Sequence, residues 1–258
     1  MSKQRSLKIG VQLQTHVVPP SAYLNVVGEA LSLGVDSVFL WDHLVPFTGQ
    51  EGDISWDTWI LLGSLAALFR GREQLLGVLV SPLSIREPAV LARSAATIAL
   101  LGNGTFILGV GSGGFVHDDN LTDAPKDVVT RMKLFSRRLA FLHEEVSRLN
   151  AECGTNILIW VGGSGEKVTI PLAIKYADGW SGFGPLSEFI NKANHFLGTN
   201  HEISVLLTPR DQNNDLQGYF DSGAHHLIRS IRPNEDLSFD LEPISQMLSE
   251  RAQLIGSL

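Results

Sequence analysis

The sequence has 258 residues, with 20 Lys and Arg against 27 Asp and Glu, so its formal net charge is −7. Charged residues make up only 18% and apolar residues 44% of the chain, which excludes a disordered protein and leads us to expect a large buried core. The acidic balance argues against a nucleic-acid partner or an anionic membrane surface. With one cysteine, Cys153, no internal disulfide is possible, and the polar N-terminus and short apolar runs favour a cytoplasmic protein.

Apolar runs alternate with helical patterns along the whole chain, without a linker or a shift in composition. The runs are almost continuously apolar, which is typical of parallel strands covered on both faces. Strands are expected at Leu7–Leu13, Val35–Trp41, Gln74–Val80, Phe106–Val110, Ile157–Val161, Trp180–Phe183, Ile203–Leu207 and His225–Ile231. Helices are expected at Leu24–Leu31 with Gly34 beyond its end, Thr58–Phe69, Pro88–Leu101, Lys126–Leu149, Ile170–Ala177, Leu186–Leu197, Leu216–Phe220 and Leu241–Ile255.

Eight strand–helix units at this length predict an α/β protein with one domain over residues 1–258, a compact (β/α)₈ TIM barrel. A doubly wound open sheet is the alternative, because alternation of strands and helices does not separate the two. In a barrel, the chemistry lies at the carboxyl ends of the strands. Candidate functional residues are therefore sought directly after each strand.

A polar pair, Asp42 and His43, follows the second strand. Histidine titrates near neutral pH and can pass a proton, and the neighbouring carboxylate could fix its tautomer. The alternative is a histidine that only caps the strand. Ser81 follows the third strand, where an ordinary polar loop is the favoured interpretation.

Glycines follow the fourth and fifth strands. Gly109 to Gly114 matches the GxGxxG pattern, but the stretch 115–125 behind it is polar and helix-breaking, so we reject a dinucleotide-binding motif. The flexible backbone would still let a ring approach closely. Successive N–H groups in the stretch 162–167 can hold an anion such as a phosphate, with a simple tight turn as the alternative. No spacing of His, Cys, Asp and Glu indicates a metal site.

At these residues the sequence resembles the bacterial luciferase-like monooxygenase superfamily, in order and over nearly the whole chain. The resemblance is carried by the second strand and its rim in Val35–Leu44, the third helix in Pro88–Ala92, Phe106–Gly113, Ile159–Lys167 and Tyr176–Trp180. It implies a TIM barrel that binds FMN or the deazaflavin coenzyme F-420 at the barrel mouth. The cofactor would lie against a bulge at Leu79, Val80 and Ser81, often with a non-prolyl cis peptide, against Gly111, Ser112 and Gly113, and against a phosphate loop of Gly162, Gly163, Ser164, Gly165 and Glu166.

The resemblance also implies a chemistry. His43 would be the catalytic proton donor or acceptor, oriented by Asp42, while a hydride moves between reduced F-420 and a small organic substrate. We expect an apolar or aromatic small molecule, lined by Gln14, Trp41, Phe115 and Phe183, with His16, Trp56 and His117 as further candidates. An FMN-dependent monooxygenase using O₂ and a non-catalytic flavin-binding barrel remain as alternatives. The resemblance further suggests a homodimer.

Three departures from the family pattern qualify these expectations. Pro171 places the start of its helix near Thr169, which loosens the hold of the helix dipole on a phosphate. Gly114 stands where the deazaflavin-dependent sugar-phosphate dehydrogenases carry an acid, so a sugar phosphate is not the expected substrate. The connection from Asn150 to Ile157 is short, so we expect an open site or one completed by a partner subunit.

Overall fold

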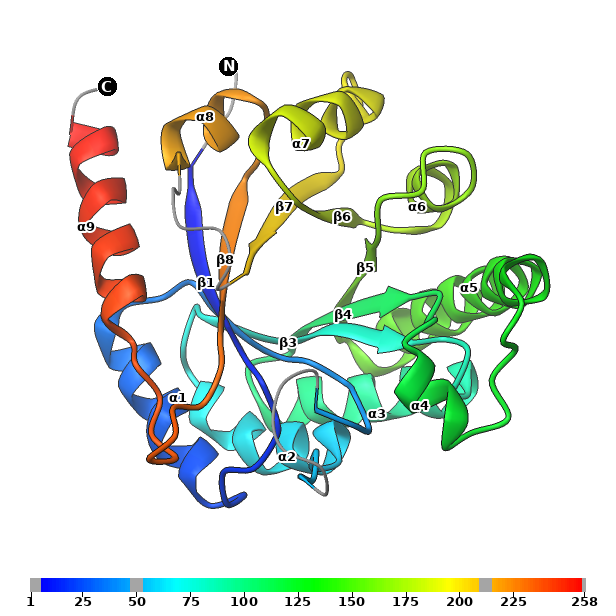
Figure 1. Cartoon of the computed structure of the whole chain (residues 1–258), viewed down its shortest axis with the longest axis horizontal. Helices are drawn as coiled ribbons and strands as arrows, with labels where there is room; N and C mark the ends of the chain where they lie inside the picture. Colours follow the sequence, from blue (N-terminus) through cyan, green and yellow to red (C-terminus); the bar gives the residue numbers. More distant parts are fainter. Residues whose placement is uncertain (1–5, 47–52, 209–214, 257–258) are drawn as a thin grey trace.

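The computed structural model describes residues 6–46, 53–208 and 215–256. Within these ranges, eight parallel strands pair in chain order and close into a barrel, with β1 hydrogen-bonded to β8 (Figure 1). The strands are β1 (Lys8–Leu13), β2 (Ser37–Leu40), β3 (Leu75–Pro82), β4 (Thr105–Gly111), β5 (Asn156–Gly162), β6 (Gly179–Phe183), β7 (Glu202–Leu207) and β8 (His226–Ile231). The predicted TIM barrel is confirmed, and the open sheet is excluded.

Helices surround the barrel, as Figure 1 shows. They are α1 (Ala22–Leu33), α2 (Thr58–Leu65), which a 3₁₀ turn extends over Ala66–Phe69, α3 (Pro88–Leu101), α4 (Val116–Asn120), α5 (Val128–Cys153), α6 (Thr169–Tyr176), α7 (Leu186–Ala193), with a 3₁₀ turn at Asn194–Phe196, α8 (Leu216–Asp221) and α9 (Glu242–Gly256). Among the described residues no helix is long and apolar enough to cross a bilayer.

One element contradicts the sequence prediction. The stretch 115–125 was expected to break helices, yet Val116–Asn120 forms the short helix α4. Phe115 precedes it in an extended conformation, and Asp118 and Asp119 lie in its first turn. Carboxylates are favoured there because the helix N-terminus carries partial positive charge. The stretch thus contributes an ordered wall to the barrel mouth.

The core has two layers. A large apolar cluster fills the space between the strands and the surrounding helices. A smaller cluster of Phe39, Leu79, Ile107, Trp160 and Ile228 packs inside the barrel, where the Phe39 and Trp160 rings lie 5.9 Å apart. The barrel interior is therefore closed by side chains below its mouth.

A polar group is buried at the opposite end of the barrel. His226, at the start of β8, is fully buried, and its Nε2 lies 2.7 Å from the Ser37 hydroxyl oxygen. Its Nδ1 lies 3.6 Å from Glu202 Oε1, which accepts a 2.8 Å hydrogen bond from Lys8 Nζ. These residues tie β1, β2, β7 and β8 together away from the mouth.

Candidate active site

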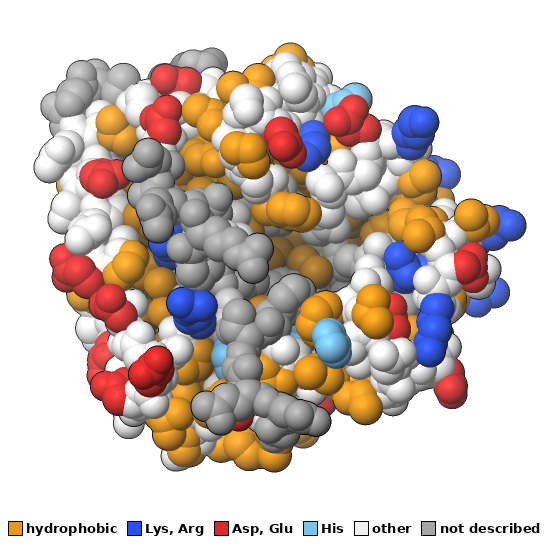
Figure 2. Space-filling model, viewed as in Figure 1, with side chains coloured by type: hydrophobic (Ala, Val, Ile, Leu, Met, Phe, Trp, Pro, Cys, Tyr) orange, Lys and Arg blue, Asp and Glu red, His pale blue; other side chains and the backbone are white. Residues whose placement is uncertain are grey.

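A cavity of about 630 Å³ opens at the carboxyl ends of the strands. Figure 2 shows a hollow at the centre of this face, with hydrophobic side chains on its walls. A volume of this size suits a cofactor or drug-sized ligand. The cavity is lined by Gln12, Gln14, Trp41, His43, Leu79, Val80, Pro82, Ile85, Gly111, Ser112, Gly113, Gly114, Phe115, Asp118, Asp119, Gly162, Gly163, Ser181, Gly182, Phe183, Leu206, Thr208, Ser230 and Arg232.

His43 is held by a carboxylate from α4. Its Nδ1 lies 2.7 Å from Asp118 Oδ2, and the side chain of Asp118 is 2% exposed. Asp118 Oδ1 also accepts the backbone N–H groups of Leu44 and Val45, at 2.9 and 3.0 Å. A carboxylate on Nδ1 keeps the proton there and directs Nε2 to exchange protons with a ligand.

The expected role of Asp42 as the partner of His43 was wrong. Asp42 instead pairs with Arg86, whose Nη2 lies 2.6 Å from Asp42 Oδ1 and whose Nε lies 3.0 Å from Oδ2. The second oxygen of Asp42 also accepts hydrogen bonds from the Ser81 hydroxyl and the Trp59 indole, at 2.7 and 3.1 Å. Adjacent residues of an extended segment point in opposite directions, so Asp42 faces the helices while His43 faces the cavity.

The same network corrects the assignment of Ser81. Its hydroxyl is fully buried and donates to Asp42, so its side chain does not line the cavity. Burial alone lowers the pKa of Arg86, but its bonds to Asp42 and Asp57 outweigh this and raise the pKa, which keeps the guanidinium charged. The buried ion pair of Arg86 and Asp42 is thus linked to β3 through the hydrogen bond from Ser81.

The third strand is bulged where the sequence predicted. The pairing of β3 with β4 shifts between Val78 and Ser81, and the Leu79–Val80 peptide bond is cis. The Leu79 carbonyl accepts a hydrogen bond from the Gln12 amide. A Cβ at Gly162 would lie 2.7 Å from Val80 Cγ1, which is tighter than real Cβ contacts. Glycine is therefore required beside the bulge, because the Val80 side chain fills the space that a side chain at position 162 would need.

The expected phosphate loop reaches the cavity only in part. Gly162 and Gly163 line it, and the Trp180 indole fixes the loop by donating to the Gly163 carbonyl at 2.7 Å. Ser164, Gly165 and Glu166 continue beyond the cavity wall toward α6, which begins at Thr169 as predicted. A phosphate at this end would be bound by backbone N–H groups of the loop.

The substrate candidates divide into two groups. Gln14, Trp41, Phe115 and Phe183 all line the cavity, and the Trp41 and Phe115 rings meet the His43 ring edge-on at 5.0 and 5.2 Å. The other three candidates do not line it: His16 is buried beside Trp41, the Trp56 indole donates to the Val18 carbonyl, and His117 packs outside against Phe115.

Several cavity residues were not singled out from the sequence. Thr208, Ser230 and Arg232 come at or just after the ends of β7 and β8, so the rule for strand ends could have found them. Asp118 and Asp119 carry no such signal, because a helix the sequence did not predict brings them to the mouth. Within residues 6–46, 53–208 and 215–256, no three His, Cys, Asp or Glu residues are grouped so as to hold a metal ion.

The chain is a TIM-barrel protein with a ligand-sized cavity at its mouth, where a bulged third strand, glycines and a carboxylate-held histidine meet. The chain belongs to the luciferase-like monooxygenase family, whose sequence profile matches residues 7–196.

Individual relatives match over shorter stretches. The chain is 34% identical over 108 residues to the F420-dependent glucose-6-phosphate dehydrogenase of Amycolatopsis mediterranei, covering 42% of this chain and 32% of that protein. It is 37% identical over 103 residues to the phthiodiolone/phenolphthiodiolone dimycocerosates ketoreductase of Mycobacterium tuberculosis, covering 34% of this chain and 27% of that protein. The chain thus spans about a third of the length of the curated relatives it matches.

Solved structures share the fold. An F420-dependent secondary alcohol dehydrogenase in complex with an F420–acetone adduct superposes with a TM-score of 0.71 at 14% identity, covering 90% of this chain and 95% of that one. The oxygenating constituent of 3,6-diketocamphane monooxygenase from Pseudomonas putida, in complex with FMN, gives a TM-score of 0.62 at 14% identity, covering 79% and 67% of the two chains.

Proposed function

We propose that this chain is an oxidoreductase that transfers a hydride between coenzyme F-420 and a small alcohol or carbonyl compound. The observation that carries the proposal is the His43–Asp118 pair, which lines the same cavity as the bulge at Leu79 and Val80. The relatives named for F420-dependent dehydrogenation support the choice of cofactor.

The cavity has distinct surfaces for the cofactor. Leu79 and Val80 would support one face of the ring, and Gly111 and Gly113 would lie along it without side chains in the way. Gly162 and Gly163 would lead the phosphate-bearing tail toward Ser164, Gly165 and Glu166. When bound, the deazaflavin supplies the hydride chemistry.

His43 would handle the proton. With Nδ1 bonded to Asp118, the ring accepts a proton from a substrate hydroxyl at Nε2 during oxidation and returns it during carbonyl reduction. Trp41 and Phe115 flank the imidazole edge-on and cover part of it, and the His43 side chain stays 23% exposed. Substrate specificity would come from the walls of the cavity, including Gln14 and Phe183.

Titration with F-420 and with FMN, followed by cofactor fluorescence, tests the proposal. We expect saturable binding of F-420 and turnover of a secondary alcohol that falls at least about a hundredfold in His43→Ala. Tight FMN binding with O₂-dependent turnover would instead establish the monooxygenase alternative, which the FMN-bound neighbour supports. Binding without turnover, or full turnover in His43→Ala, would contradict the proposal.

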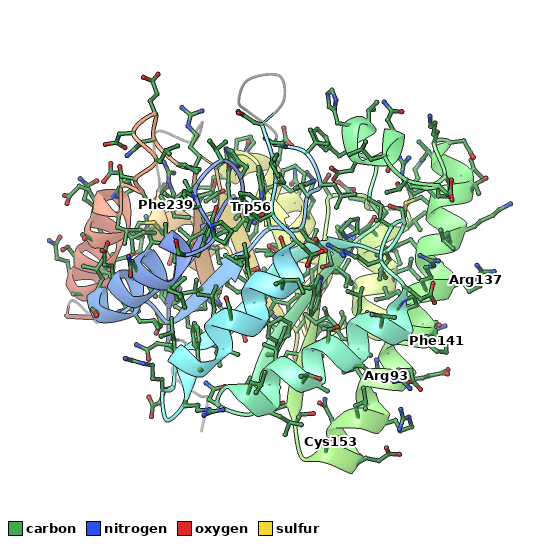
Figure 3. The ribbon with its side chains drawn as sticks, turned by 90° about the horizontal axis from the view of Figure 1, so that it is seen from below. Trp56, Arg93, Arg137, Phe141, Cys153 and Phe239 are labelled. Carbon is green, nitrogen blue, oxygen red and sulfur yellow. The ribbon has the colours of Figure 1, made fainter. Side chains whose placement is uncertain are left out.

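We also propose that the chain forms a homodimer through α2 and α3. Ile60 and Val90 are 75% and 62% exposed there. Val90 also borders a surface hollow whose other lining residues are Trp59, Gly63, Arg93, Ser94, Thr97, Ile98 and Leu101. Figure 3 shows α2, α3 and α5 side by side on the outside of the barrel, with Arg93 and Phe141 on this side. Exposed apolar side chains beside a surface hollow suit a self-complementary interface.

Light scattering after size-exclusion chromatography tests the dimer. Val90→Glu should dissociate it, whereas Leu24→Glu, at an exposed apolar position on α1, should leave it intact. A monomeric wild type would refute this interface. The cytoplasmic location remains a prediction, which cell fractionation tests.

A further inference from the structure

Asp119 of α4 is the second carboxylic acid on the wall of the cavity, beside Asp118. Asp119 lines the cavity wall and is 4% exposed, and its Oδ1 has no hydrogen-bond partner among the described residues. Its neighbour Asp118 is equally buried, but both of its oxygens are bonded, to His43 and to the backbone after β2. The two adjacent carboxyl groups of α4 therefore differ in hydrogen bonding: both oxygens of Asp118 are bonded, whereas Oδ1 of Asp119 is not.

Burial without a partner is costly for a carboxyl group, so the missing hydrogen bond points to a ligand. The backbone position of Asp119 is fixed, because Asp118 anchors α4 to the segment after β2 and the Asp119 N–H donates to the Phe115 carbonyl at 3.0 Å. The backbone at Asp119 is therefore held at the cavity wall in part by the residue that also holds His43.

No neighbouring side chain in the described ranges is seen to pair with the carboxyl group of Asp119. A Cβ at Gly114 would lie 2.9 Å from Arg131 Nη2, so Arg131 occupies the space that a side chain at position 114 would need. Arg131 Nη1 donates to the carbonyls of Pro125 and Lys126, both at 3.3 Å. No ion pair joins Asp119 to a cation within the described ranges.

Gln14 offers a second acceptor in the same cavity. Its Nε2 donates a hydrogen bond to the Ser230 hydroxyl at 3.3 Å. Its Oε1 is a buried hydrogen-bond acceptor that has no partner in the described part of the chain. A ligand that hydrogen-bonds to both Gln14 and Asp119 must present hydrogen-bond donors. Arg232 also lines the cavity, and its positive charge favours neutral hydroxyl groups over ammonium groups.

We propose that Asp119 binds a hydroxyl group of the substrate other than the one that reacts at His43. The substrate class is then an alcohol or ketone that carries at least one further hydroxyl group. This inference rests on the proposed function for the identity of the reaction, but Asp119 and the cavity define the binding contact on their own.

Matched pairs of small alcohols that differ by one hydroxyl group test the proposal: cyclohexanol with 1,2-cyclohexanediol, 2-butanol with 2,3-butanediol, and 1-phenylethanol with 1-phenyl-1,2-ethanediol. Dissociation constants are measured by ligand-observed NMR on the F-420-saturated chain and on the chain alone. We expect at least one diol to bind wild type about tenfold or more tightly than its partner.

Two variants and a control complete the experiment. Asp119→Leu should remove the preference for the diol, and Asp119→Asn, which keeps an acceptor oxygen, should retain part of it. Asp123→Leu, at an exposed position in the same connection, should bind as wild type does. Urea unfolding of each variant establishes that the comparison is made on folded protein.

The outcomes separate this proposal from the proposed function. Equal binding of all pairs by wild type, or an unchanged preference in folded Asp119→Leu, would overturn the role of Asp119. So would a loss of F-420 affinity in Asp119→Leu, because the residue would then contact the cofactor. If wild type fails to bind F-420, the proposed function fails, while the measurements on the chain alone still decide the contact.

Discussion

His43 Nδ1 lies 2.7 Å from Asp118 Oδ2, although 75 positions separate the two residues in the chain. The pair joins the end of β2 to a five-residue helix that follows β4. The proton-handling residue and the residue that positions it therefore come from different strand–helix units. Each can be varied without changing the local sequence around the other.

Asp118→Asn should lower kcat by about a hundredfold or more while changing the affinity for F-420 little. The amide can still accept from Leu44 and Val45 through its oxygen, but its NH₂ group cannot accept the proton on His43 Nδ1. Steady-state kinetics and cofactor fluorescence measure the two effects. An unchanged kcat would show that Asp118 does not position the histidine.

Gly109→Ala should destabilise the fold by about 1–3 kcal/mol, because the added methyl group would overlap the backbone oxygen of Val78 at the bulge. Gly28→Ala, in α1, is the matched control, since nothing lies within 4 Å of its added Cβ. Alanine is the better helix former, so the control should gain up to about 1 kcal/mol. Urea unfolding of both variants checks the prediction, and similar effects at the two sites would contradict it.

Arg86→Met should destabilise the chain by about 3–5 kcal/mol, because it leaves the buried Asp42 carboxylate without its counter-charge. The double variant Arg86→Met with Asp42→Leu should recover much of this loss, since it removes both charges. Chemical denaturation of the two single variants and the double variant gives the coupling. Additive losses would show that the pair does not act as a unit.

The stability of the fold should fall as the pH is lowered from 7 to 5. Burial lowers the pKa of His226, while Glu202 partly opposes the change. The unfolded chain binds a proton at this residue below about pH 6.5 and the folded chain does not, so each proton taken up favours unfolding. The stability contributed by the neutral ring is present above about pH 6.5 and is lost below it.

Glu202 adds a second loss at lower pH. Burial raises its pKa, but His226 and Lys8 outweigh this and bring it down to about 2. Its contribution is therefore present above about pH 4.5 and is lost as the pH falls toward 2. Urea midpoints measured from pH 8 down to about pH 2 check both steps. In His226→Gln the dependence between pH 7 and pH 5 should be weaker, and an unchanged slope would assign it to other groups.

The fold was accessible from the sequence because strands buried on both faces read as continuous apolar runs. Residues that follow those runs were placed correctly at the mouth, as Gly111, Gly162 and His43 illustrate. The bulge at Leu79 and Val80 was found through the family resemblance, since nothing in the residue types alone indicates it.

The partner of His43 could not be read in this way. Adjacency in sequence suggested Asp42, but in an extended segment adjacent side chains point apart, and Asp42 faces Arg86. Asp118 becomes the partner only through α4, a helix too short to leave a periodic pattern. Contacts between distant units depend on three-dimensional packing that one sequence does not encode locally.

A helix of five residues is far shorter than the length at which an isolated helix holds together in water. The helix α4 must then owe its order to its surroundings, chiefly to the anchoring of Asp118. If α4 unwinds, His43 loses its carboxylate and Asp119 leaves the cavity in the same event. A ligand that engages Asp119 would therefore also favour the arrangement in which His43 is ready for proton transfer, so that substrate recognition and catalytic competence are thermodynamically coupled.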